Sequence, residues 1–167
     1  MKRTRHEAGF TLVEGMVATA ILSIGVLAMA GLHGISLKRN VDSTELSLAS
    51  NMANEMVERI RYNRRNAVAY NGIDTSAVCA QNPITQPMAL GDCTQWRAMM
   101  TAQQTAGASQ ANVLPAVRGQ VQVNPIATNP SLGQNAVLVT VTWSGLSMGN
   151  TPGSTRTVRV NTVVAPE

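Results

Sequence analysis

The chain has 167 residues, of which 13% are charged and 3% are aromatic, and its formal net charge is +4. This length suits one compact domain with an extension, and the scarcity of aromatic residues means that the core must rest on aliphatic side chains and methionine. The positive charge does not by itself indicate a nucleic-acid-binding protein, because three of the 13 basic residues are Lys2, Arg3 and Arg5 at the very N-terminus.

An uncharged segment follows this basic N-terminus at residues 15–37. About 20 apolar residues are enough for a helix to span the core of a bilayer, and the segment contains no proline that would interrupt a helix. The basic residues lie before the segment, which places the N-terminus in the cytoplasm. The segment is therefore predicted to cross the membrane once, with the rest of the chain on the far side.

Three interpretations of this N-terminus are open. In the first, residues 16–27 are the hydrophobic region of a secretory signal that is cleaved after Ala30, in the A-x-A sequence AMA. In the second, the segment is a membrane anchor that is never cleaved. In the third, cleavage occurs before the segment, after Gly9, so that the segment is retained and Phe10 becomes the new N-terminus.

Glu14 favours the third interpretation. A carboxylate in hydrocarbon costs about 2.5–3.5 kcal/mol or more, and neither a secretory signal nor a plain anchor has a use for it. After cleavage, Glu14 would be the fifth residue and would lie one helical turn from Phe10, on the same face. A carboxylate there can pair with an amino terminus, its own or that of a neighbouring chain, which offsets the cost of burying either charge.

The sequence GFTLVE at residues 9–14, with a basic leader before it and an apolar helix after it, resembles the class III signal of type IV pilins and pseudopilins. The resemblance implies that a prepilin peptidase cleaves after Gly9 and that the new terminus, Phe10, is N-methylated. It also implies that Glu14 guides the subunit into the fibre. The chain would then be a substrate of a peptidase and a structural subunit.

Residues 22–34, LSIGVLAMAGLHG, resemble minor pilins of the PilV type. This narrower resemblance implies a minor type IV pilin that helps to prime pilus assembly in a tip complex with other minor pilins, next to the major pilin. Such proteins support twitching motility and adhesion and can carry a large tip adhesin. The chain would reside in the inner membrane with a periplasmic domain, and later in the fibre at the cell surface. Gly15 and Gly31 depart from common family residues, and whether the helix bends or locally melts near Gly31–Gly34 stays open.

The helical pattern continues beyond residue 37. Leu48, Met52, Met56 and Ile60 recur every four residues, with Ala49, Ala53 and Val57 beside them, as one apolar stripe. A helix from Phe10 to about Tyr62 is predicted, with its second half packed on a globular domain. The predicted organisation is a leader at 1–9, a membrane or fibre-core half at 10–37, an amphipathic half at 38–65 and a globular domain at 66–167.

The globular domain is predicted to be irregular at first and then β-rich. Cys79 and Cys93 are the only cysteines, and an exported chain lies in an oxidising compartment, which favours a disulfide.

A short helix at 94–105, capped by Asp92 or Thr94, would bury Trp96, Met99 and Met100. Three strands are predicted at 119–123, 135–143 and 154–164. Short turns between them favour antiparallel pairing and an α+β fold.

The sequence offers no set of catalytic residues, because the exported part contains no histidine beyond His33 and few carboxylates. No cofactor or metal motif is recognisable, and two thiols are too few for a structural zinc site.

Four arginines at the end of the long helix raise a DNA-binding pilin as an alternative, although nucleic acid is not the expected partner. A second alternative is a pseudopilin of a type II secretion system. The four arginines are Arg59, Arg61, Arg64 and Arg65.

Overall fold

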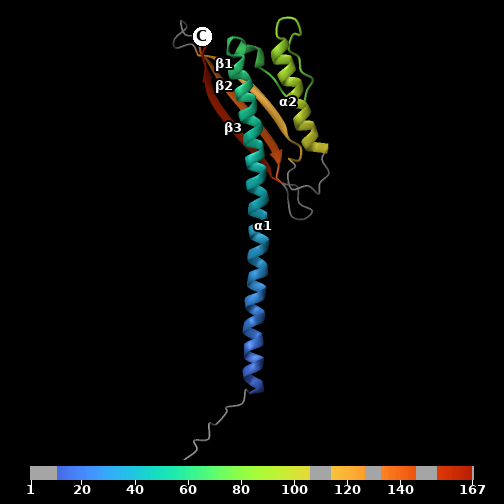
Figure 1. Cartoon of the computed structure of the whole chain (residues 1–167), viewed down its shortest axis with the longest axis vertical. Helices are drawn as coiled ribbons and strands as arrows, with labels where there is room; N and C mark the ends of the chain where they lie inside the picture. The colour runs from blue at the N-terminus through green and yellow to red at the C-terminus, as the bar shows by residue number, and fades with distance from the viewer. Residues whose placement is uncertain (1–10, 106–113, 127–132, 146–153, 167) are drawn as a thin grey trace, which may run out of the picture. The chain divides into compact units, whose positions relative to one another are not determined.

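A computed structural model describes residues 11–105, 114–126, 133–145 and 154–166. Its elements run along the chain as helices and then strands (Figure 1): α1 (Leu12–Tyr62), the 3₁₀ helix η1 (Arg64–Tyr70), α2 (Pro87–Thr105), β1 (Arg118–Pro125), β2 (Asn135–Ser144) and β3 (Thr155–Val164). The chain divides into two units, residues 1–40 and 41–167, so that α1 contributes to both. The predicted α+β fold, with a long N-terminal helix and a small antiparallel sheet, is confirmed.

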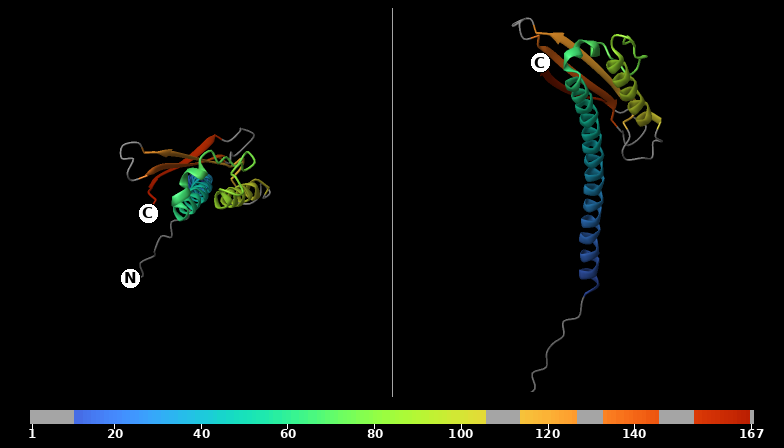
Figure 2. Two further views of the ribbon diagram at one scale, coloured as in Figure 1. Left: turned by 90° about the horizontal axis from the view of Figure 1, so that it is seen from above. Right: turned by 45° about the horizontal axis from the view of Figure 1, so that its top comes forward.

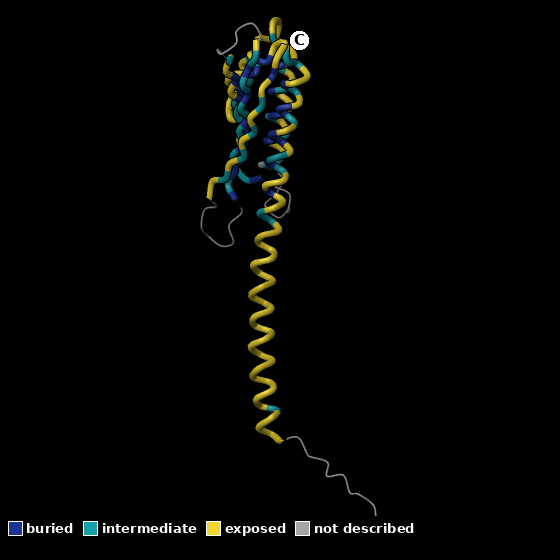
Figure 3. Tube along the Cα trace, turned by 90° about the vertical axis from the view of Figure 1, so that its left-hand side faces the viewer, coloured by how far each residue is buried: buried dark blue, intermediate teal, exposed yellow. Residues whose placement is uncertain are grey.

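The part of α1 in the first unit is an exposed apolar helix. Its large apolar side chains are uncovered, from Leu12 at 80% exposure to Leu37 at 60%, and Figure 3 shows this stretch as exposed apart from one short intermediate segment near its start. Two of its hydroxyl groups bond to the helix's own backbone: Thr19 Oγ1 donates to the Gly15 carbonyl at 3.0 Å, and Ser23 Oγ donates to the Thr19 carbonyl at 2.7 Å. These polar side chains therefore need no water, which suits an apolar surrounding.

The glycines of this helix do not interrupt it. The α-helix is continuous from Leu12 to Tyr62 and includes Gly31 and Gly34, so the helix does not melt at these glycines. Nearby, His33 Nδ1 lies 2.8 Å from the Met29 carbonyl, within hydrogen-bond distance.

The sheet has three antiparallel strands in the order β1-β2-β3. Val121, Val139 and Val160 stand side by side across the three strands. In β2 the residues alternate strictly between buried and half-buried, with Val137, Val139 and Val141 facing inward. This is the pattern of a sheet with one face on a core. The three predicted strands are confirmed, and their bounds differ from the expected ones by at most two residues.

In the second unit, two helices cover one face of the sheet. Seen from above, the strands form one layer, and α1 and α2 lie side by side in the other (Figure 2). The predicted apolar stripe of α1 lies in the core between them, with Leu48 only half-buried at its start. Trp96 of α2 is fully buried, and its indole Nε1 donates to the Met52 carbonyl of α1 at 3.1 Å. The residues of α1 and α2 in the core are Ala49, Met52, Ala53, Met56, Val57, Ile60, Ala89, Cys93, Trp96 and Met100.

The second helix begins earlier than the sequence suggested. It starts at Pro87, so the prediction of a start near Thr94 with Asp92 or Thr94 as its cap was wrong. Proline is well placed in the first turn because its missing N–H would have no helical partner there. Upstream, Asn82 Oδ1 accepts from the backbone N–H groups of Ile84 and Thr85 and forms the turn that leads into the helix. Of the expected buried face, Trp96 and Met100 are buried, whereas Met99 is half-buried.

Candidate functional site

The described chain begins at Thr11, one residue after Phe10, the predicted new N-terminus. Gly9 and Phe10 lie outside the described residues. Thr11 precedes the first helical residue, and its Oγ1 accepts a hydrogen bond from the backbone N–H of Glu14 at 3.3 Å. The Thr11 carbonyl accepts from Gly15 N–H at 3.2 Å. Thr11 therefore caps the N-terminus of α1, and the order Thr-x-x-Glu is that of a capping box.

Glu14 lies in the first turn of α1 and is exposed. A carboxylate at this position is stabilised by the positive end of the helix dipole. The sequence interpretation assigned Glu14 to an amino terminus, and the capping arrangement adds a local reason for the same residue. The two roles predict different effects of replacing Glu14 by Gln, since a capping box accepts either residue at this position.

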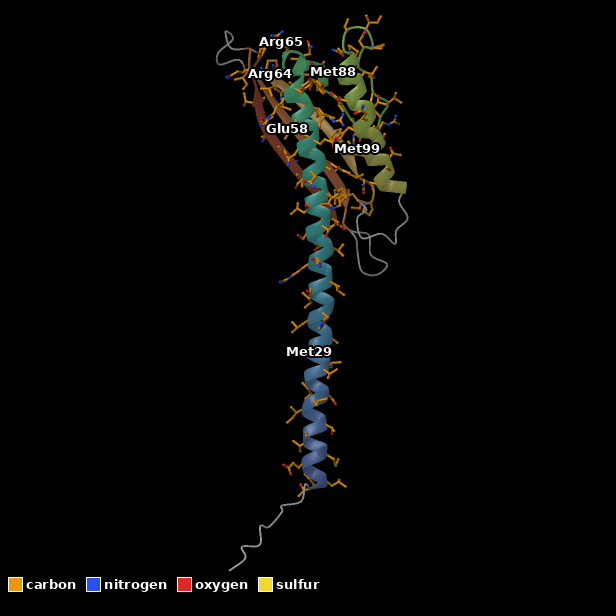
Figure 4. The ribbon with its side chains drawn as sticks, viewed as in Figure 1. Met29, Glu58, Arg64, Arg65, Met88 and Met99 are labelled. Atoms are coloured by element: carbon orange, nitrogen blue, oxygen red, sulfur yellow. A yellow bond between two sulfur atoms is a disulfide. The ribbon has the colours of Figure 1, made fainter. Side chains whose placement is uncertain are left out.

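The apolar part of α1 is long and apolar enough to cross a membrane. An 18-residue window of the helix has a mean hydropathy of 2.1, and none of this window is buried within the chain. A core helix of a water-soluble domain would have its apolar face covered by other elements, as Met52, Met56 and Ile60 in the second half of α1 are. The exposed side chains include Met29, at 65% exposure, which Figure 4 labels.

The arginines near the end of α1 are engaged with carboxylates to different extents. Arg59 donates to Glu55 Oε1 at 2.7 Å and to Asp92 Oδ1 at 2.9 Å. Partial burial alone would lower the pKa of Arg59, but the hydrogen bonds and charges of Glu55 and Asp92 outweigh it and raise that pKa. Glu55 and Arg59 are four residues apart, the spacing at which oppositely charged side chains meet on a helix. The role of Asp92, far along the chain, was not visible in the sequence.

Arg61 is also paired. Its Nη1 donates to Glu58 Oε1 at 2.7 Å, and its Nη2 donates to Thr162 Oγ1 of β3 at 2.9 Å. Figure 4 places Glu58 near the end of α1, with Arg64 and Arg65 just beyond it. Arg59 and Arg61 therefore have carboxylate partners, which weakens the basis for a phosphate-binding surface at this helix end.

The two cysteines are joined as the sequence suggested. Cys79 and Cys93 form a disulfide with a Cα–Cα distance of 6.0 Å. Cys93 is buried in α2, so the bond ties the irregular segment before this helix to the helix itself. Among the described residues, no group of three or more His, Cys, Asp or Glu side chains is placed to hold a metal ion.

One charged group in the core was missed by the sequence analysis. Glu45 of α1 is buried, and its carboxylate accepts hydrogen bonds from Trp143 Nε1 at 2.9 Å and from Arg156 Nη1 at 3.3 Å. Glu45 lies four residues before Ala49, so the helical period of the apolar stripe, extended by one turn, places it on the buried face. That signal was available in the sequence, but its partners were not.

Residues 4–30 match the prokaryotic N-terminal methylation motif. No curated protein and no solved structure matches the chain. The matched segment contains Gly9, Phe10 and Glu14 and extends into the exposed apolar part of α1. This match, together with the α+β fold and its long apolar N-terminal helix, supports membership of the type IV pilin-like family.

Proposed function

We propose that the chain is a minor type IV pilin of the PilV type, which helps to prime pilus assembly in a tip complex with other minor pilins. The observation that carries the proposal is the methylation motif at residues 4–30, which extends into an apolar helix that the described part of the chain leaves uncovered. In this role the leader is removed after Gly9, Phe10 is methylated, and the helix anchors the subunit in the inner membrane with its C-terminal domain in the periplasm.

Assembly into the fibre would bury the exposed apolar helix among its neighbours. Residues 10–37 pack beside the same segment of other pilins, and the carboxylate of Glu14 pairs with a neighbouring amino terminus. The domain at 66–167 contacts the other minor pilins and the major pilin, supports twitching motility and adhesion, and can carry a large adhesin at the tip.

The test separates the two roles of Glu14. Glu14→Gln keeps a side chain that suits the capping box but removes the charge, whereas Thr11→Ala removes the cap and keeps the charge. If Glu14 pairs with an amine, Glu14→Gln and Glu14→Ala are both cleaved normally yet reach sheared surface pili poorly, and Thr11→Ala is incorporated. Normal incorporation of Glu14→Gln would mean that the charge is not required.

A second experiment distinguishes a minor pilin from a pseudopilin of a type II secretion system, whose N-terminus would have the same motif. The gene is deleted, and twitching motility and protein secretion are both measured. Loss of motility and surface pili with intact secretion supports the proposal, and the reverse result assigns the chain to the secretion machine. Complementation with the wild-type chain is the control.

A further inference from the structure

Lys38 and Arg39 mark the end of the apolar part of α1. They follow residues 15–37, which carry no formal charge, and no other Lys or Arg occurs between Phe10 and Glu58. Both side chains are exposed. Within the described part of the chain, neither forms an ion pair. The helix therefore presents two adjacent cations at one level along its axis.

The carboxylates best spaced to neutralise these cations are engaged elsewhere. Asp42 is four residues after Lys38 and three after Arg39, a spacing that supports ion pairs on a helix. Its Oδ1 instead accepts a hydrogen bond from Arg156 Nη2 of β3 at 2.9 Å. Glu45, in the next turn, is buried against Trp143 and the same Arg156. The sheet thus compensates the charges of Asp42 and Glu45, and these carboxylates do not pair with Lys38 or Arg39.

We propose that Lys38 and Arg39 bind the phosphates of anionic phospholipid headgroups at the far surface of the membrane. The inference rests on the proposed insertion of α1 in the bilayer. Residues 15–37 span roughly 34 Å at 1.5 Å per residue, which is close to the ~30 Å thickness of a hydrocarbon core. The two cations then lie at headgroup level, where long basic side chains extend into the polar layer.

The timing of leader removal gives this pair a role of its own. Before cleavage, Lys2, Arg3 and Arg5 hold the other end of the span at the cytoplasmic surface. Cleavage after Gly9 removes all three, and Lys38 and Arg39 remain as the only Lys or Arg side chains bordering the span. They set the depth of the mature helix, and the subunit must exchange their phosphate contacts for other anions when it leaves the membrane.

The experiment uses the full chain, purified in detergent and titrated with phosphatidylglycerol while native mass spectrometry counts the retained lipids. Lys38→Gln/Arg39→Gln is compared with the wild type and with Arg65→Gln/Arg159→Gln. This control removes the same charge from two exposed arginines of the second unit. We expect the Lys38/Arg39 variant to bind the lipid roughly 25-fold more weakly, at about five-fold per cation, and the control to bind as the wild type does.

Further measurements identify the source of the phosphate and show whether a negative result contradicts the membrane insertion or only the headgroup site. Phosphatidylcholine should be retained less than phosphatidylglycerol, and millimolar inorganic phosphate should not displace the lipid. Equal lipid binding by the wild type and the Lys38/Arg39 variant, an equal loss in the control, or displacement by inorganic phosphate would each overturn the proposal. Alkaline extraction of cell membranes separates the two failures: release of the wild-type chain contradicts insertion itself, whereas a retained chain with unchanged lipid binding contradicts only the headgroup site.

Discussion

The carboxylate of Glu45 in α1 accepts a hydrogen bond from the indole Nε1 of Trp143 in β2 at 2.9 Å, across 98 positions of sequence. The Glu45 side chain is only 1% exposed, and the guanidinium of Arg156 in β3 supplies the compensating charge. A buried carboxylate is tolerated when charge and hydrogen bonds are both satisfied in this way. The arrangement fixes α1 to two strands at once.

Breaking this arrangement should be costly. Glu45→Ala leaves the Trp143 N–H and part of the Arg156 charge without a partner, and we expect a loss of about 3–5 kcal/mol in the free energy of unfolding. Trp143→Phe removes one donor from the buried carboxylate and should cost about 1–3 kcal/mol. Urea unfolding of the full chain in detergent, followed by circular dichroism, measures both.

The matched control for these variants is Glu58→Ala. Glu58 also pairs with an arginine of the chain, but its side chain is 67% exposed. An exposed ion pair contributes about 0–1 kcal/mol, so the control should lose little. A loss for Glu45→Ala no larger than that for Glu58→Ala would contradict the structural role assigned to the buried carboxylate.

Acid should weaken the second unit through Asp74. Hydrogen bonds from Arg118 lower the pKa of the Asp74 carboxyl most, partial burial opposes them, and bonds from Ser76 and Gln120 lower it further. The folded pKa lies below the ordinary value of about 4. The contribution of Asp74 to stability is therefore complete above that value and is lost as the pH falls towards the folded pKa.

The variant Asp74→Asn tests this pH dependence. At pH 7 it should be less stable than the wild type, and the difference should shrink steadily as the pH is lowered from about 5 towards 2. Urea midpoints measured at several pH values follow the difference directly. A difference that stays constant over this range would mean that the carboxylate charge of Asp74 contributes nothing to folding.

The disulfide should stabilise the segment before α2. Cys79 and Cys93 are separated by 14 residues, and closing a loop of this size contributes about 3 kcal/mol in the chain-entropy model. We expect Cys79→Ala/Cys93→Ala to lose about that much in urea unfolding. Reductant should destabilise the wild type similarly and leave the variant unchanged. A wild type that is insensitive to complete reduction would show that the bond does not support the fold.

The two edges of the sheet should differ in amide hydrogen exchange. At the outer edge of β1, Val121 N–H donates to the Ile73 carbonyl at 2.9 Å, and the Val121 carbonyl accepts from Gly72 N–H at 3.0 Å. Gly119 N–H donates to Thr75 Oγ1 at 2.8 Å. The segment before α2 thus covers this edge. Among the described residues, β3 has β2 as its only neighbouring strand.

The register identifies the amides that distinguish the edges. Successive residues of a strand point their N–H groups to opposite sides. The N–H of Val121 points outward, away from β2, so the N–H of its partner Val139 points towards β3 and that of Val160, paired with Val139, points back towards β2. The N–H groups of Val158 and Val160 therefore face β2, and those of Arg159 and Asn161 face away from it. Exchange measured by NMR in the detergent-solubilised chain should be fast at Arg159 and Asn161 and slow at Val121, Val158 and Val160. Slow exchange at Arg159 in the unassembled chain would contradict an open edge.

Much of the fold followed from local patterns. The uncharged segment at 15–37 and the four-residue period of Met52, Met56 and Ile60 each predict a helix, and strict alternation predicts β2. Such patterns are readable because solvent, lipid and core each select side chains at the period of the element that faces them. The motif at 9–14 is readable for a related reason, since a short linear signal acts through its own residues.

What the sequence left undecided depends on partners that are distant along the chain. The residues around Glu45 in the sequence do not indicate its partners Trp143 and Arg156, and those around Asp92 do not indicate Arg59. The start of α2 at Pro87 was not recognised because the turn formed by Asn82 was not predicted. Whether Lys38 and Arg39 can bind a phosphate also depends on a distant residue, because Arg156 binds the carboxylate of Asp42 that is spaced to pair with them. Pattern in the sequence determined which surfaces are apolar. Only the tertiary structure decided which charges are compensated, because ion pairs and hydrogen bonds act over a few ångströms in space, whatever the separation in sequence.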